Sequence, residues 1–117
     1  MRQIPVDTSA AAVMVAQPPQ IKMRDKKNGV IAMDPETGHT LMTVDVMYAA
    51  YGSAEVITVT VAEPDISGDL VMGTPVALTG LVARPWENEF NGTKRHGISF
   101  RAAAVTALVP AAANGQG

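Results

Sequence analysis

The 117-residue chain contains no cysteine, and it has only one Trp, two Tyr and two Phe. It therefore cannot form disulfides, use a thiolate nucleophile or bind zinc through cysteine sulfur. No apolar run approaches the roughly 18 to 20 residues that a membrane-spanning helix needs. The apolar run at 10–16 ends at Gln17-Pro18-Pro19, which is not the pattern of a cleaved signal peptide. These absences fit a reducing compartment, and we predict a cytoplasmic protein with no membrane segment.

Patterns typical of enzymes are also missing. The sequence has no glycine-rich phosphate loop, no nucleophile elbow and no paired carboxylates beyond chance. Its two histidines, His39 and His96, are far apart and have no acidic residue at helical spacing, which makes a poor metal site. We therefore expect a non-enzymatic protein without a cofactor or a metal ion.

The charged residues are clustered, although the net charge is only −2. An acidic balance argues against a general nucleic-acid binder, because such affinity comes mainly from cations that neutralise phosphates. Apart from Arg2, however, every cationic side chain falls into one of two groups, which are Lys22, Arg24, Lys26 and Lys27, and Arg84, Lys94, Arg95 and Arg101. One face of the folded chain could therefore be positive while the total is not.

Alternating apolar and polar residues predict an antiparallel hairpin in the middle of the chain, over 41–48 and 54–62. In each strand, side chains two residues apart share a face. The residues predicted to face the core are Met42, Val44, Val46, Tyr48, Ile57, Val59 and Val61. Thr58 and Thr60 should point away from the core.

Three further strands complete the predicted sheet. Residues 11–17 favour a strand, although their alanines would also suit a short helix, and the alternation continues over 20–24. A fourth strand covers 75–83, with Gly80 at its middle, where a bend would let a small sheet curl closed. The fifth covers 98–109, with Ile98, Phe100 and Ala102 in one phase and a helix at the alanines as the alternative.

Residues 86–96 form a polar segment between the fourth and fifth strands, and we predict a loop there. The pair Asn91-Gly92 is typical of a tight hairpin turn. Trp86 and Phe90 supply flat rings, and Lys94 and Arg95 supply positive charge. This combination suits a nucleic-acid strand, because bases stack on aromatic rings while phosphates attract cations. The alternative for Trp86 is that its indole plugs the end of the body.

The pattern of strands predicts an all-β protein, a small five-stranded OB-like barrel with long first-to-second and fourth-to-fifth strand loops. An open two-sheet sandwich is the alternative. We expect one domain over residues 1–110 and a disordered tail over 111–117. In an OB barrel the two long loops flank one binding face, so both basic groups would converge there. The predicted nucleic-acid contacts are Lys22, Arg24, Lys26, Lys27, Arg84, Trp86, Phe90, Lys94, Arg95 and Arg101.

Five segments, in this order, resemble small regulatory proteins encoded by integrative and conjugative plasmids of actinobacteria. They are RQIPVDTS, DPETGHTLMTVDV, EVITVTV, GTPVALTGLVARPW and RHGISFRA. The resemblance implies a role in replication, transfer or maintenance of a mobile element, without an assigned chemistry. A weaker similarity, which includes the closing Leu108-Val109-Pro110, is to the single-stranded DNA-binding proteins of filamentous phages, which are small OB-type dimers. The acidic balance of this chain departs from them.

These observations together predict a non-enzymatic regulatory protein that binds single-stranded DNA, alone or as a homodimer, in plasmid replication or transfer. The alternative is a protein-interaction module that regulates a plasmid replication or transfer protein without contacting nucleic acid. Such a module would use a sheet edge or the face that carries Met47.

Overall fold

The computed structural model describes residues 3–108, and this part of the chain is all-β apart from one 3-10 turn, η1 (Glu63–Asp65). None of its helical segments has the length and apolar character to cross a membrane. The predicted tail at 111–117 lies outside the described residues. The strands are β1 (Ile4–Pro5), β2 (Ala12–Ile21), β3 (Met23–Asp25), β4 (Val30–Ile31), β5 (Leu41–Ala50), β6 (Ser53–Ala62), β7 (Ile66–Ser67), β8 (Val76–Thr79), β9 (Val82–Phe90), β10 (Thr93–Arg101) and β11 (Ala104–Ala107).

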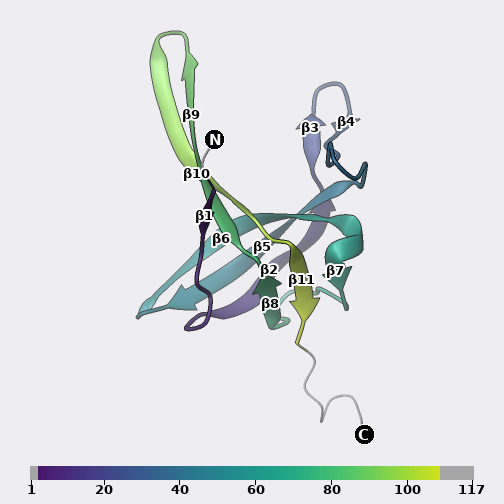
Figure 1. Cartoon of the computed structure of the whole chain (residues 1–117), viewed down its shortest axis with the longest axis vertical. Helices are drawn as coiled ribbons and strands as arrows, with labels where there is room; N and C mark the ends of the chain where they lie inside the picture. Colours follow the sequence, from purple (N-terminus) through teal and green to yellow (C-terminus); the bar gives the residue numbers. More distant parts are fainter. Residues whose placement is uncertain (1–2, 109–117) are drawn as a thin grey trace, which may run out of the picture.

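One six-stranded sheet, in the order β1-β9-β10-β6-β5-β2, forms most of the molecule (Figure 1). β5 and β6 make the predicted antiparallel hairpin, with an unbroken register from Leu41–Ala62 to Ala50–Ser53. β10 joins β6 in parallel, but only two residue pairs connect them, Phe100 with Val59 and Arg101 with Thr60. The long hairpin of β9 and β10 is therefore attached to the rest of the sheet at its base alone.

The sheet curls into a half-barrel because two long strands bend at the same level. Gly80, with φ +60°, lies between β8 and β9, as the sequence predicted, and Ala102 and Ala103 separate β10 from β11. The two bends touch, since the N–H of Ala103 donates to the carbonyl oxygen of Thr79 at 2.8 Å. Beyond the bends, β8 and β11 pair with each other, and β8 reaches β2 through a bridge between Pro75 and Met14.

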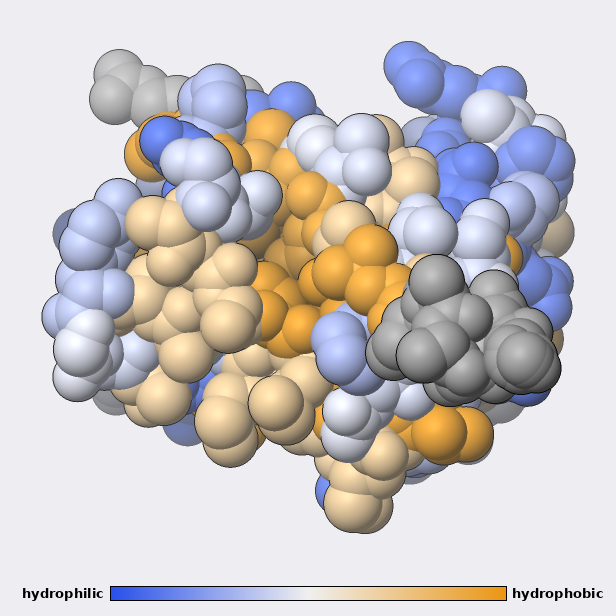
Figure 2. Space-filling view, turned by 90° about the horizontal axis from the view of Figure 1, so that it is seen from below, coloured by the Kyte–Doolittle hydropathy of each residue, from blue (hydrophilic) through white to orange (hydrophobic). Residues whose placement is uncertain are grey.

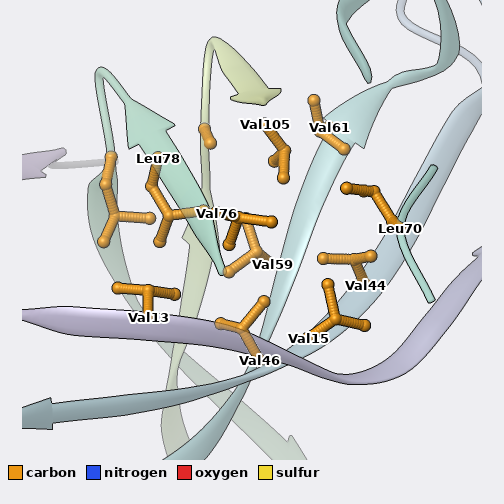
Figure 3. Close-up of a cluster of buried hydrophobic side chains, with 12 residues drawn as sticks. Val13, Val15, Val44, Val46, Val59, Val61, Leu70, Val76, Leu78 and Val105 are labelled. Atoms are coloured by element: carbon orange, nitrogen blue, oxygen red, sulfur yellow. The ribbon is translucent and has the colours of Figure 1, made fainter. Parts of the chain in front are cut away.

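Valine side chains fill the space that the curled sheet encloses (Figure 3). Val44, Val46, Val59 and Val61 are fully buried there, which confirms the predicted inward phases of the central hairpin, and Met42, Tyr48 and Ile57 pack at its margin. Burying one such valine contributes about 1.5 to 3 kcal/mol, so the core does not depend on aromatic residues. The end of the body opposite the hairpins also has a mostly apolar middle (Figure 2).

Two hairpins project from the same side of the body (Figure 1). The long arm, residues 82–101, consists of β9 and β10, which pair along their whole length and close at Asn91 and Gly92 with positive φ. The short arm, residues 23–31, consists of β3 and β4 and lies within the connection between β2 and β5. The two arms leave the body separately, with the strands of the sheet between them.

The prediction of a long loop over residues 86–96 is wrong, because these residues form most of the long arm. A hairpin that projects from the body has no core to cover, so its strands lack the apolar alternation that marks a strand in sequence. For the same reason Ile98, which the sequence placed in one phase with Phe100, is 59% exposed. Ile98 pairs with Pro85 on β9 and lies in the part of β10 that projects from the body.

Candidate nucleic-acid interface

Three cationic side chains from the two predicted groups meet at the base of the long arm. Lys22 follows the end of β2, Arg84 lies on β9 and Arg101 ends β10. Together with Leu41, Thr60, Ser99 and Phe100 they line one small pocket, which we call the basal pocket. The pairing of Ser99 with Arg84, and of Arg101 with Thr60, places these residues on the sheet face opposite the core.

Hydroxyl groups complete the polar lining of the basal pocket. The ammonium of Lys22 donates to Oγ1 of Thr60 at 3.2 Å, and Oγ of Ser99 donates to the carbonyl oxygen of Arg84 at 3.3 Å. Thr60 points away from the core as predicted, yet it is only 8% exposed. The pocket therefore holds cations and hydroxyls close together, which is the donor set that binds a phosphate or another oxyanion.

The three cations of the basal pocket repel one another. The pKa of Lys22 is lowered from 10.5, first because burial penalises its charged form, and then because of the charges of Arg101 and Arg84. This ammonium belongs to a half-buried side chain that lines the same pocket as two guanidinium groups. A bound anion would offset both effects, because it replaces lost solvation and adds an opposite charge.

One carboxylate, Asp34, partly neutralises the pocket. Its Oδ2 accepts a hydrogen bond from the guanidinium of Arg101 at 2.7 Å. A hydrogen bond from the backbone N–H of Glu36 and the contact with Arg101 together hold the pKa of Asp34 below 3.8. Three cations against one anion leave an excess of positive charge in the pocket.

The neighbouring cavity is larger, about 580 Å³, but its charge is mixed. It shares Arg84 and Arg101 with the basal pocket and adds the carboxylates of Asp34, Glu36 and Asp65. These acids would repel a phosphate. An anion is therefore expected on the Lys22 side of the two arginines, and the larger cavity is the less suitable of the two.

Trp86 lies on the long arm and does not plug the body. It is 38% exposed, and its ring covers Gly97, its direct partner on β10. Since residues two apart on a strand share a face, the indole lies on the same face of the arm as Arg84. A flat ring and a cation thus follow one another along the arm from the basal pocket. β9 ends at Phe90, whose side chain lies outside the described part of the structure.

The remaining predicted cations are spread over the two arms. Arg24, on β3, and Lys26 and Lys27, at the tip of the short arm, are exposed. On the long arm, Arg95 is exposed, and Lys94 pairs with Glu87 at 3.3 Å in a contact that is open to solvent. The two groups therefore meet through Lys22, Arg84 and Arg101, whereas the tips of the arms remain apart.

The sequence did not reveal the pocket residues Thr60 and Ser99, or Asp34, which pairs with Arg101 from outside the pocket lining. Asp34 opens a segment, 34–38, whose proline and glycine are typical of a turn, and nothing in it indicates a distant partner. The outward phase of β6 was the one available signal for Thr60. Among residues 3–108, no three His, Cys, Asp or Glu side chains gather closely enough to hold a metal ion.

Comparison with known proteins gives no match to this chain among family models, curated proteins or solved structures.

Proposed function

We propose that this protein is a non-enzymatic, OB-like barrel that binds single-stranded nucleic acid, with DNA as the expected ligand. Its proposed role is regulatory, in the replication or transfer of a mobile element. The observation that carries the proposal is the meeting of Lys22, Arg84 and Arg101 in one pocket between the bases of two projecting arms, close to an exposed indole.

The strand order supports the OB-like part of the proposal. Three pairs of consecutive strands, β2–β3, β8–β9 and β10–β11, are each one bent or interrupted strand. Counted in this way, and with β5 and β6, the chain has five long strands. Their neighbours follow the order first, second, third, fifth, fourth, and the fourth returns to the first through the bridge of Pro75 and Met14. The short and long arms then occupy the first-to-second and fourth-to-fifth connections, which flank the binding face in OB proteins.

In the proposed complex, one backbone phosphate lies in the basal pocket and an adjacent base stacks on Trp86. Such stacking contributes about 1 to 3 kcal/mol per base. Arg95 and the cations of the short arm would contact flanking phosphates. The indole favours a single strand over a duplex, because bases in a duplex are already stacked on one another and offer no free face.

A salt series with a fluorescently labelled single-stranded oligonucleotide tests this proposal. Binding should weaken steeply between about 50 and 200 mM salt, because each phosphate contact releases counterions. Trp86 is the only tryptophan, so stacking should also quench the intrinsic emission of the protein. Absence of binding near 50 mM salt, or binding that does not respond to salt, would overturn the proposal.

Arg84→Gln tests whether the basal pocket is the centre of the site. We expect roughly a tenfold loss of affinity and a salt slope reduced by about one. Arg24→Gln removes the same charge from an exposed position outside the pocket and should cost less. If the two variants lose the same affinity, binding is spread over the positive surface and the pocket is not its centre.

A protein-interaction module remains the second candidate, because Met47 and Val56 are exposed side by side on the outer face of β5 and β6. The net charge of −2 also favours it. Capture of a plasmid replication or transfer protein that survives nuclease treatment would support this candidate. It should also survive replacement of both Lys94 and Arg95 by Glu, since these cations serve only the nucleic-acid proposal.

A further inference from the structure

One carboxylate, Asp45, lies among uncharged side chains on the outer face of β5 and β6. These two strands separate the long arm from β2, which leads into the short arm. Val44 and Val46 are fully buried, and alternation along the strand therefore directs Asp45 outward. The outward side chains over 43–49 and 54–60 are Thr43, Asp45, Met47, Ala49, Ala54, Val56, Thr58 and Thr60.

Asp45 is held in place by its neighbour on the adjacent strand. The hydroxyl of Thr58, directly opposite on β6, donates to Oδ1 of Asp45 at 2.6 Å. In the described part of the chain, the other oxygen, Oδ2, has no hydrogen-bond donor beside it. A carboxylate has about four acceptor positions, so most of them remain available. Asp45 is thus a partly exposed acceptor in a fixed orientation.

This carboxylate lies one step along the sheet from the basal pocket. Thr60, which lines the pocket, is two residues beyond Thr58 on β6 and so lies diagonal to Asp45. The α-carbons of such diagonal neighbours are about 7 to 8 Å apart. A nucleotide whose phosphate lies in the pocket can span this distance with its own base. Trp86 lies in the other direction, along the arm, so the two positions receive different bases.

A carboxylate beside a bound strand repels phosphates and attracts the N–H groups of bases. Guanine is the best match, because its N1–H and its N2 amino group lie side by side on the Watson–Crick edge and can both donate to one carboxylate. Adenine and cytosine offer an amino group next to a ring nitrogen that is an acceptor. Thymine offers a single N–H between two carbonyl oxygens. In these three bases an acceptor faces the carboxylate and weakens the contact.

Apolar side chains next to Asp45 can support the ring of such a base. Met47 is the next outward residue on β5, and Val56 lies opposite it on β6. Their exposed fractions are 38% and 56%. A methionine sulfur makes favourable contacts with aromatic rings. A purine, which has two rings, covers more of this pair than a pyrimidine does while its edge contacts Asp45.

We propose that Asp45 selects guanine at the position of the bound strand next to the phosphate in the basal pocket. Thr58 is a positioning residue, because it acts by orienting the carboxylate. The inference rests on the proposed binding function and adds a base preference to it. The outer face of the second and third strands is where OB proteins bind oligonucleotides, and β5 and β6 take those places here.

Fluorescence anisotropy with two labelled single strands tests the preference. One strand contains only thymidine, and the other has one central guanine in place of thymine. The unmodified protein should bind the guanine strand at least about fivefold more tightly at the same salt concentration. Inosine at the central position keeps N1–H but lacks the N2 amino group, so it should lose most of this gain.

Asp45→Asn should bind the two strands equally, because its amide places an N–H where guanine also has one. Its affinity for the thymidine strand should not fall, since the variant loses a negative charge. Asp69→Asn is the matched control, because it removes the same charge from an exposed position in the connection between β7 and β8. It should keep the preference. Thr58→Val retains the branched shape without the hydroxyl and should reduce the preference.

Equal affinity of the unmodified protein for the two strands would overturn the inference and leave the proposed function standing. A guanine preference that persists in Asp45→Asn, with circular dichroism showing intact strands, would overturn it too, because the preference would then come from stacking alone. Absence of binding to either strand would instead overturn the proposed function, and this inference with it.

Discussion

The indole ring of Trp86 lies against the backbone of Gly97 on the neighbouring strand. A β-carbon on Gly97 would fall 2.6 Å from Cζ2 and 2.8 Å from Cε2 of that ring. Gly97 does not have positive φ, so the close approach of the ring, and not the backbone conformation, requires glycine here. The pair fixes the position of the one tryptophan on the face of the long arm that carries Arg84.

Gly97→Ala should push the indole off the arm while leaving the strand intact, since alanine accepts an extended backbone. We expect a red-shifted tryptophan emission, easier quenching by acrylamide and a severalfold loss of affinity for a single-stranded oligonucleotide. The stability cost should stay near 0.5 to 1 kcal/mol, because the ring lies at the surface and can swing away. Unchanged emission would contradict this packing.

Asp34→Asn should strengthen anion binding in the basal pocket. The change removes the carboxylate that occupies Arg101 at 2.7 Å, yet the amide oxygen can still accept the hydrogen bond from Glu36. We expect severalfold tighter binding of an oligonucleotide at low salt, measured by fluorescence anisotropy. Asp25→Asn changes the net charge equally but lies on the short arm, so a similar gain there would show that only the overall charge matters.

The lowered pKa of Lys22 predicts a change of stability at alkaline pH. Between the folded pKa and 10.5, the unfolded chain binds more protons at this group than the folded chain does. The free energy of unfolding therefore gains a favourable contribution as pH rises through that window. Urea unfolding of the protein and of Lys22→Met should show the gain only when Lys22 is present. Parallel curves would contradict it.

Gly68 and Gly73 form a matched pair for a stability test, because both have φ +89°. A β-carbon on Gly73 would meet nothing within 4 Å, whereas one on Gly68 would lie 2.6 Å from the β-carbon of Ala107. Gly73→Ala should cost about 1 to 2 kcal/mol for backbone strain alone. Gly68→Ala should cost about 1 to 3 kcal/mol more, through overpacking against β11. Thermal or urea unfolding would separate the two.

Local patterns predicted the central hairpin well. β5 and β6 are consecutive, and each has one face on the core, so alternation alone identified Val44, Val46, Val59 and Val61 as buried. The long arm was missed over most of its length because both of its faces lack a core to cover. There, only the turn pair Asn91-Gly92 indicated a hairpin, and it says nothing about how far the strands extend.

The basal pocket could be predicted only in part, because its contacts are distant in sequence. Lys22 contacts Thr60 across 38 positions, and Arg101 contacts Asp34 across 67. The first contact crosses from the end of β2 over β5 to β6, and the second depends on how β10 docks beside β6, a parallel pairing that residue periodicity does not reveal. The sequence identified cations that could form a site, but not which of them share a pocket or which carboxylate opposes them.

The bend shared by Gly80 and Ala103 has a mechanical consequence. β9 and β10 run without interruption into it, and β8 and β11 emerge on its other side, where Val105 is fully buried. The hydrogen bond between Ala103 and Thr79 therefore lies where the arm joins the body. A substitution that disturbs this contact is therefore expected to change both the orientation of the arm and the packing of the body.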